Sequence, residues 1–385
     1  MPPVTRLRKK GLPPPPAHDT PPAYSVDLSL PAPQRHQHIA TAYRDPLSRI
    51  LPSLYRDVLS TLPCAALLDR ASHVFLRRLH SRDETEELRT YAAVTGVPMH
   101  ILVAYNVFLD LMMGCISGGV VGGSTGTMLH FRGLDWGMET LRPLVLALEF
   151  LRSGETVAHT LTYAGYIGVL TGVRDGLSMS LNYRATLAGG PEWLRIVPHW
   201  LAVLLGLRPS ISSRLRGLLL APTPAPGVEG LVATTRAWVS SPCYLLFCTP
   251  TRVVLLEKGF RSARVMEESQ FAAVANHDVD MEEWDEDTFR GLAARSGGVG
   301  MAELVADSRM RKQLVADAWR RRSSRVSRTG GGGGTVRLRD VIKWLQIPEV
   351  TNECTHFSCV MDPAAGTIVW SRWWRESPGT DYSGG

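Results

Sequence analysis

The chain changes character abruptly at Gly114, and this boundary constrains its fold more than any other feature. Before it, from about 43 to 111, apolar residues recur at three- and four-residue spacing, which is the pattern of amphipathic helices. After it, as far as Arg184, the sequence is punctuated by glycine and carries short apolar runs typical of strands. Further helical and strand-like blocks follow. Elements arranged in such blocks predict an α+β layer structure.

Periodicity predicts most of the individual elements. Helices are predicted at 83–95, across 192–220 with breaks at Pro198 and Pro209, at 303–322 and at 338–345. Strands are predicted at 24–30, 128–131, 144–151, 156–163, 177–183, 244–247, 253–257, 271–276, 357–361 and 367–371.

The same features divide the chain into segments. Residues 1–35 are rich in proline, and they are expected to form an extended arm that carries one short strand. Residues 36–114 are a helical front chain, and residues 115–385 hold the predicted sheets. Within the latter, residues 323–334 end in five consecutive glycines, and they are expected to be a flexible surface loop.

The composition excludes several classes of protein. With 385 residues, 44% of them hydrophobic and 20% charged, the chain is neither collagen-like nor disordered overall. A net charge of +6 is too mild to imply a nucleic-acid partner. Residues 1–16 lack the apolar run of a secretory signal, and no apolar stretch has the ~20 residues of a membrane span, so neither is expected.

Cys115 is the first candidate for catalysis. It lies at the boundary between helices and strands, directly after Gly114. A cysteine thiolate is a strong nucleophile, but it needs a base to take its proton. If the bond between Gly114 and Cys115 were cut, the new α-amine, with a pKa of about 8, would lie beside the thiol and serve as that base. The alternative is a small buried side chain with no catalytic role.

The stretches around Cys115 resemble a known family. MLHFRGLDWG at 128–137, YAGYIGVLTG at 163–172 and LNYR at 181–184 follow Cys115, and PPAYSVDLSLP at 21–31 precedes it. In order and spacing they are similar to the acid ceramidases and the acid amidases of N-acylethanolamines, within the cholylglycine hydrolase group of N-terminal nucleophile hydrolases. The resemblance covers most of the chain. It implies a four-layer αββα sandwich behind an α-helical N-terminal segment.

The resemblance also implies the site. Cys115 matches the family nucleophile, which is freed by autocatalytic cleavage after Gly114. Arg132 and Asp135 match the pair that orients the thiol and holds the new amine; their spacing of three requires Asp135 to lie past the end of a regular strand. Asn276 matches the family's donor to the oxyanion. A later arginine of the family matches either Arg309 or Arg311, with Arg309 preferred. The positions matched to substrate binding are Trp136, Tyr166, Asn182 and Tyr183.

Two positions depart from the family pattern. Ile116 stands where acid ceramidases have threonine, so a hydroxyl that could assist self-cleavage is missing. Tyr183 stands where they have glutamate, so a carboxylate near the site is missing. The first departure bears on processing and the second on substrate and pH optimum.

Three other functions are less well supported by the sequence: metal binding, phosphate binding and nucleic-acid binding. Cys243 with Cys248, and Cys354 with His356 and Cys359, could hold a metal, but the spacings favour buried thiols or one local disulfide. The glycine-rich stretch 118–126 lacks the lysine of a phosphate-binding loop. The arginines of 309–328 have no interleaved aromatic residues, which favours a solvated helix over a nucleic-acid site.

The sequence therefore predicts an amidohydrolase for N-acyl lipids, with ceramide as the first substrate and an N-acylethanolamine as the second. No cofactor and no nucleic-acid partner are expected, and peripheral membrane contact through apolar helices such as 193–207 is open. The two pieces of a cut chain are expected to stay associated. The alternative is a catalytically silent relative that binds lipid or protein. The resemblance suggests a lysosome-like or secreted location, whereas the missing signal suggests the cytoplasm.

Overall fold

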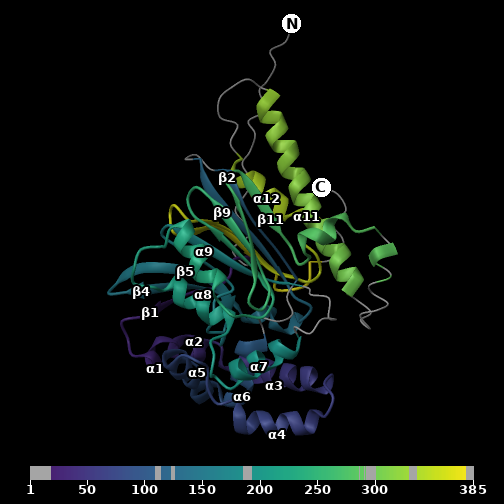
Figure 1. The fold of residues 1–385 in the computed structure, drawn as a ribbon. Helices are drawn as coiled ribbons and strands as arrows, with labels where there is room; N and C mark the ends of the chain where they lie inside the picture. The colour runs from purple at the N-terminus through teal and green to yellow at the C-terminus, as the bar shows by residue number, and fades with distance from the viewer. Residues whose placement is uncertain are drawn as a thin grey trace.

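The computed structural model describes the chain in eight stretches: 19–108, 114–122, 126–184, 193–285, 287–289, 291, 301–328 and 336–378. Two β-sheets stack face to face at the centre of the molecule, and helices cover their outer faces (Figure 1). Among the described residues, no helix combines the length and apolar character that crossing a bilayer requires.

The larger sheet has eight strands in the order β1-β4-β5-β6-β7-β8-β9-β10. β1 runs parallel to β4, and the other pairs are antiparallel. The strands are β1 Ala23–Asp27, β4 Val145–Arg152, β5 Glu155–Tyr163, β6 Thr171–Arg174, β7 Leu177–Tyr183, β8 Cys243–Cys248, β9 Val253–Lys258 and β10 Ala263–Glu268.

The smaller sheet has five antiparallel strands in the order β11-β2-β3-β12-β13. They are β11 Phe271–Val274, β2 Gly114–Gly122, β3 Thr127–Asp135, β12 Thr355–Asp362 and β13 Thr367–Trp373. β2 was not predicted, because its glycines mask the strand pattern. Gly118 explains their presence: a Cβ there would lie 2.1 Å from the Phe131 ring, so the neighbouring strands leave no room for a side chain.

Helices form the outer layers. α11 Met301–Arg328 and α12 Leu338–Leu345 pack on the smaller sheet, and α8 Ile211–Leu219 and α9 Val228–Arg236 pack on the larger one. The front helices gather at one end of the sheets (Figure 1). They are α1 Ala32–Arg35, α2 Gln37–Ala42, α3 Arg44–Ser60, α4 Ala65–Phe75, α5 Arg82–Thr95 and α6 Met99–Phe108, joined there by α7 Trp193–Leu204. The four layers confirm the predicted αββα sandwich.

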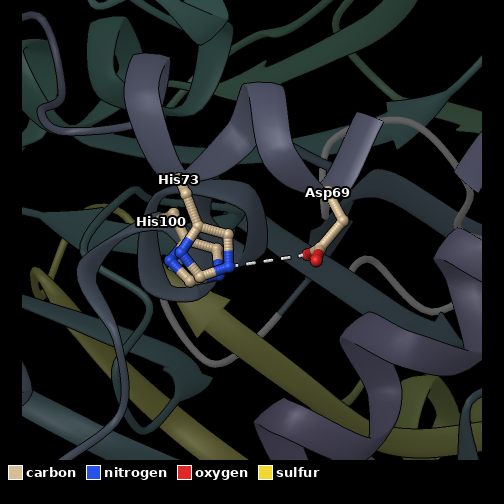
Figure 2. Close-up of side chains that lie close together, drawn as sticks. All are labelled: Asp69, His73 and His100. Carbon is tan, nitrogen blue, oxygen red and sulfur yellow. Dashed lines mark ion pairs between the residues drawn. The ribbon is translucent and has the colours of Figure 1, made fainter. Parts of the chain in front are cut away.

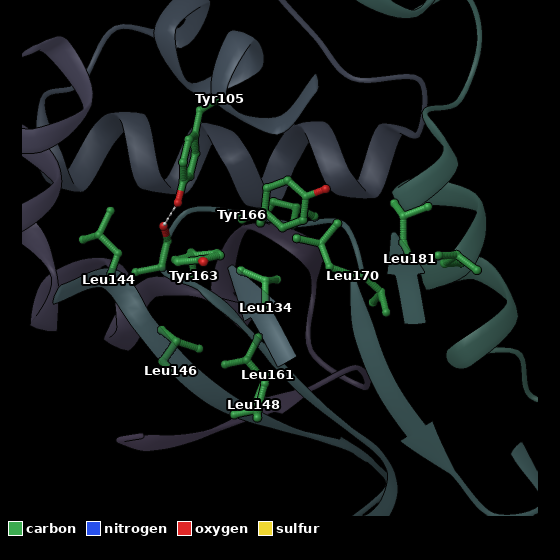
Figure 3. Close-up of a cluster of buried hydrophobic side chains, with 14 of the residues drawn as sticks. Tyr105, Leu134, Leu144, Leu146, Leu148, Leu161, Tyr163, Tyr166, Leu170 and Leu181 are labelled. Atoms are coloured by element: carbon green, nitrogen blue, oxygen red, sulfur yellow. Dashed lines mark hydrogen bonds between the residues drawn. The ribbon is translucent and has the colours of Figure 1, made fainter. Parts of the chain in front are cut away.

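The main core fills the space between the sheets and beneath the front helices. Figure 3 shows its centre, where Leu134 of β3 lies among Leu146 and Leu161 of the larger sheet, with Tyr105 of α6 above them. A second cluster packs the smaller sheet against α11 and α12, and it contains Ile116. The two faces of β2 therefore pack into different cores.

Two predictions about helix ends were wrong. Residues 323–328, expected in a flexible loop, belong to α11, which has no glycine or proline to end it there and is tied to α12 by the Arg322–Asp340 ion pair at 3.0 Å. Pro198 does not break α7, which continues to Leu204 because the packing of its apolar side chains outweighs one lost backbone hydrogen bond. The rest of the predicted loop, 329–334, lies outside the described residues.

Candidate active site

Cys115 is the second residue of β2, and its side chain is fully buried. It pairs with Leu134 of β3, while Gly114 lies opposite Asp135. The peptide bond between Gly114 and Cys115 is intact in this structure. The nitrogen of Cys115 is therefore an amide that donates a hydrogen bond, and it does so to Oδ1 of Asn276 at 2.8 Å.

The surroundings of the thiol oppose its ionisation. Burial raises the pKa of Cys115, the positive charge of Arg132 lowers it in part, and the carboxylate of Asp135 raises it further. The net direction is upward, so the thiol keeps its proton at neutral pH. It can act as a nucleophile only if a neighbouring group takes that proton.

Arg132 lies on β3 with its guanidinium buried between the two sheets. It donates to Oγ of Ser117 at 2.8 Å, to the carbonyl of Leu181 at 2.8 Å and to Oδ1 of Asn182. Asn182 also accepts from Ser117 Oγ at 2.8 Å and donates to the carbonyl of Ala275 at 3.1 Å. Asn182 therefore holds Arg132 in place, and its predicted contact with substrate stays a prediction.

Asp135 is the last residue of β3, not a residue beyond it as the spacing predicted. Side chains alternate along β3, so Asp135 lies on the face opposite Arg132 and Leu134, which is the face that α11 covers. Arg311 donates to Asp135 Oδ2 at 2.6 Å, and Thr355 Oγ donates to Oδ1 at 2.7 Å. Burial raises the pKa of Asp135, and the Arg311 charge opposes that rise.

The later arginine of the site is Arg311, and the prediction of Arg309 was wrong in placement. Arg311 also donates to Oδ1 of Asn276 at 3.2 Å. Arg309 points away, donating to the carbonyls of Trp284 at 3.1 Å and Glu282 at 2.7 Å. Two residues that are two apart on a helix face nearly opposite directions, so only one of them can reach the sheet.

Asn276 lies two residues after the end of β11, and its side chain forms hydrogen bonds with Cys115, Arg311 and Tyr183. Its Oδ1 accepts from Cys115 and Arg311, while its Nδ2 donates to the carbonyl of Tyr183 at 2.8 Å. In the uncut chain the predicted oxyanion donor is thus bound to a backbone carbonyl. The Asn276 amide carries two N–H groups, so its bond to Tyr183 does not by itself exclude a role as oxyanion donor.

Both departures from the family pattern lie away from the thiol. Ile116 faces the core under α11 and α12, on the opposite side of β2 from Cys115, so a hydroxyl at this position would not reach the site side of the strand. Ser117, not singled out in the sequence, supplies a hydroxyl on the Cys115 face. The Tyr183 ring packs with Met281 and Val305, and only its carbonyl reaches Asn276.

A cavity of about 280 Å³ lies between the front helices and the end of β3. Trp136, next to Asp135, forms part of its wall, and its predicted contact with substrate stays a prediction. Tyr166 is buried against Tyr105 and does not line this cavity. The other lining residues are almost all apolar: Leu51, Leu54, Tyr55, Val58, Leu59, Leu62, Leu68, Ala71, Ser72, Phe75, Leu76, Ile101, Ala104, Tyr105, Met138, Leu201, Leu204 and Leu205.

The sequence analysis missed most of these lining residues. The front segment was predicted as amphipathic helices, with no cavity assigned to it. The apolar residues of α4 were a signal, and the structure leaves two of them, Leu67 and Phe75, 67% and 58% exposed. None of the six cysteines, all of which lie in described stretches, forms a disulfide.

Comparison with known proteins supports the resemblance. Residues 19–80 match the family model for the beta subunit of N-acylethanolamine-hydrolyzing acid amidase. Mouse acid ceramidase is 31% identical over 219 residues, which are 50% of this chain and 55% of the relative. Human acid ceramidase is 30% identical over 196 residues, 45% of this chain and 49% of the relative. The chain thus spans about half the length of the curated relatives it matches.

A solved structure is also similar. The N-acylethanolamine-hydrolyzing acid amidase ortholog of Caenorhabditis elegans is 22% identical, with a TM-score of 0.49, and the match covers 68% of this chain and 100% of that one.

The two stacked sheets with their outer helices form an α+β sandwich that buries Cys115 near Arg132 and Asp135. The matched stretches are similar to acid ceramidases and to N-acylethanolamine-hydrolysing acid amidases.

Proposed function

We propose that this chain is an amidohydrolase that cuts the amide bond of N-acyl lipids through Cys115, once the bond after Gly114 has been cleaved. The hydrogen bond between the Cys115 nitrogen and Asn276 Oδ1, 2.8 Å long, is the observation that carries the proposal. Cleavage would turn that nitrogen into an amine already held within a buried polar cluster. The names of the relatives, acid ceramidase and N-acylethanolamine-hydrolyzing acid amidase, support the substrate class.

In the proposed mechanism the freed amine takes the proton of the Cys115 thiol. The thiolate attacks the acyl carbonyl, and the carbonyl oxygen takes the electron pair and becomes an oxyanion. The ammonium then returns the proton to the leaving nitrogen as the C–N bond breaks, which leaves a thioester on Cys115. Water attacks the thioester and releases the fatty acid, restoring the thiol.

Charged neighbours support each stage of this sequence. The Arg132 charge favours the thiolate, because it lowers the pKa that burial raises. The carboxylate of Asp135 attracts the positive charge that develops on the amine, and Arg311 fixes that carboxylate at 2.6 Å. Backbone N–H groups and Asn276 Nδ2 are the proposed donors to the oxyanion.

The apolar cavity favours an acyl chain as the part of the substrate that is bound. Its wall is formed by leucines of α3, α4 and α7 and reaches Trp136, one residue beyond Asp135. An acyl chain in this cavity would direct its carbonyl toward the end of β3. Ceramide is the first proposed substrate, and an N-acylethanolamine is the second.

Apolar side chains around the cavity support contact with a membrane surface. Leu67 and Phe75 of α4 and Leu201 of α7 are 67%, 58% and 53% exposed. A lipid substrate could pass from a bilayer into the cavity between these helices without crossing water.

The two pieces of the cut chain are proposed to stay together. Glu87 of α5 pairs with Arg216 of α8 at 2.7 Å, in a buried ion pair that joins segments on either side of Cys115. Arg35 also contacts Glu87, at 3.1 Å. The front helices share the main hydrophobic core with the sheets, so separation would expose that core to water.

Intact mass measurement of the wild type and Cys115→Ala, at acidic and neutral pH, tests the proposal. Cleavage after Gly114 divides the 42.3 kDa chain into pieces of about 12.5 and 30 kDa. We expect the wild type to split and the variant to stay whole, and the split protein to hydrolyse ceramide. If the wild type stays whole in every condition, the reading as a silent, lipid-binding relative takes its place.

A further inference from the structure

Three side chains of the front helices lie together beside the apolar cavity. Asp69 and His73 are one helical turn apart on α4, and His100 is the second residue of α6. Each offers one donor atom, and these atoms all lie within 4.8 Å of one another. Among the residues that the structure describes, this is the group of histidine and carboxylate side chains that comes close enough to share a metal ion.

We propose that Asp69, His73 and His100 bind one divalent transition-metal ion of the zinc type. The proposal concerns a site separate from Cys115, and it does not depend on the amidase activity.

The positions suit tetrahedral coordination. Zinc binds imidazole nitrogen and carboxylate oxygen at about 2.0–2.2 Å, so two ligand atoms of a tetrahedral ion lie about 3.4 Å apart. His73 Nε2 and Asp69 Oδ1 are 3.7 Å apart, close to that separation. The widest pair in the group, at most 4.8 Å, must close by about 1.4 Å, which small side-chain rotations can supply.

The imidazole rings of His73 and His100 already lie against each other. Their ring centroids are 3.8 Å apart with an angle of 36° between the planes. Figure 2 shows the rings lying one over the other, with Asp69 beyond their edge. His73 and Asp69 are four residues apart on one helix face, the spacing at which two side chains can chelate one ion.

Outer contacts hold the ligands in place. Tyr55 of α3 donates to Asp69 Oδ1 at 3.1 Å, and its hydroxyl is 2.6 Å from Ser72 Oγ. The Tyr55 ring also packs edge-on against His100, with centroids 5.5 Å apart. Hydrogen bonds of this kind to a coordinating carboxylate are a regular part of metal sites.

The donor set selects the kind of ion. Two imidazoles and one carboxylate suit zinc, nickel or copper, whereas magnesium and calcium prefer oxygen ligands alone. Three protein ligands leave a fourth position for water. The His73 side chain is 57% exposed, so an ion can enter from solvent, while His100 is buried.

Binding would tie α4 to α6 along one wall of the cavity. Leu68, Ala71 and Phe75 of α4 line that wall, as do Ile101 and Ala104 of α6. An ion that joins the two helices would restrict the movement of α4, and would therefore set the width of the route by which an acyl chain enters.

Zinc titration of the purified full-length chain, carrying Cys115→Ala so that processing plays no part, tests the site. We expect one zinc ion per chain and a rise in Tm with zinc concentration, because the ion binds the folded state. We expect Asp69→Asn and His73→Ala to weaken zinc binding by at least tenfold, since even outer contacts of metal sites contribute about 10–100-fold. Magnesium should cause neither effect.

Two controls separate this site from others. His38→Ala removes an exposed histidine of α2 that is outside the cluster, and it should leave zinc binding unchanged. Cobalt in place of zinc should give visible absorption without a thiolate charge-transfer band, which excludes the cysteines as ligands. Asp69→Asn and His73→Ala change exposed or half-buried positions, so their folding can be verified by their Tm without metal. Equal zinc binding by wild type and both variants, or no saturable binding at all, would overturn the proposal.

Discussion

Asn276 accepts a hydrogen bond from the backbone nitrogen of Cys115 at 2.8 Å, and this bond joins residues 161 positions apart. It fixes the orientation of the Asn276 amide, because the same oxygen also accepts from Arg311 and the nitrogen donates to Tyr183. The Asn276 side chain thus contacts the peptide unit at the proposed cleavage site. It also contacts Arg311, which is proposed to act in the cleaved enzyme. Processing and hydrolysis should respond differently to changes at Asn276.

Asn276→Asp and Asn276→Ala separate the two roles. Asp keeps an oxygen acceptor for the Cys115 nitrogen and loses the N–H donor, whereas Ala loses both. We expect Asn276→Asp to be cleaved after Gly114 and to lose about 10²–10³-fold in kcat on an N-acyl substrate, the usual effect of removing an oxyanion donor. Asn276→Ala should also be cleaved more slowly, as followed by intact mass against time. Full activity in cleaved Asn276→Asp would rule out the donor role.

Arg311→Met and Arg309→Met are a matched pair on one helix. Arg311 is buried against Asp135, and its removal leaves a buried carboxylate without its partner, which typically costs about 3–5 kcal/mol. Arg309 donates to two backbone carbonyls on the other side of α11, and its guanidinium lies over the Phe289 ring. We expect a large loss of unfolding free energy and of processing for Arg311→Met, measured by urea unfolding and intact mass. A larger loss for Arg309→Met would contradict the assignment of the site arginine.

The Cys115 neighbourhood shows how far sequence reasoning reached. Family stretches located Cys115, Arg132, Asp135 and Asn276, and the structure brings all four to the ends of β2, β3 and β11. The choice between Arg309 and Arg311 depended on which face of α11 meets the sheet. That face is fixed by tertiary packing, and the local pattern around the two arginines does not contain it.

Three other features also depend on tertiary packing, which the local sequence pattern does not contain. The Asp135 side chain meets Arg311 and Thr355, which lie 176 and 220 positions later in the chain, because α11 and β12 pack beside the end of β3. The cavity is formed by four helices that pack at its rim, and each helix alone has an ordinary apolar stripe. The β2 strand was hidden by its glycines, one of which, Gly118, admits the Phe131 ring of the next strand.

Ala71→Phe should narrow the apolar cavity. Ala71 is a lining residue of α4, and a phenyl ring there would occupy part of the 280 Å³. We expect a rise in KM of at least tenfold for long-chain substrates and a smaller rise for short-chain ones, because only the long chains need the full depth. Ala66→Phe, an exposed change on the same helix, is the control. Equal effects on both chain lengths would show that the cavity does not hold the acyl chain.

The free energy of unfolding should fall as the pH drops below about 6.5. Burial lowers the pKa of His36 from 6.5 to about 4, and Glu87 opposes this shift only in part. A group with a lower pKa in the folded state binds protons more readily when unfolded. Stability is therefore complete above 6.5 and is lost as the pH falls from 6.5 toward 4.

Three further buried histidines add to this dependence of the unfolding free energy on pH. Burial lowers the pKa of His130 and His356 to about 3 and of His199 to about 4. We expect His36→Asn to reduce the dependence of unfolding free energy on pH between 6.5 and 4, measured by urea unfolding at several pH values. His38→Ala, which removes an exposed histidine two residues away, should keep the wild-type slope. A slope that is the same in all three proteins would mean that folding does not change the pKa of His36, and that its contact with Glu87 balances its burial.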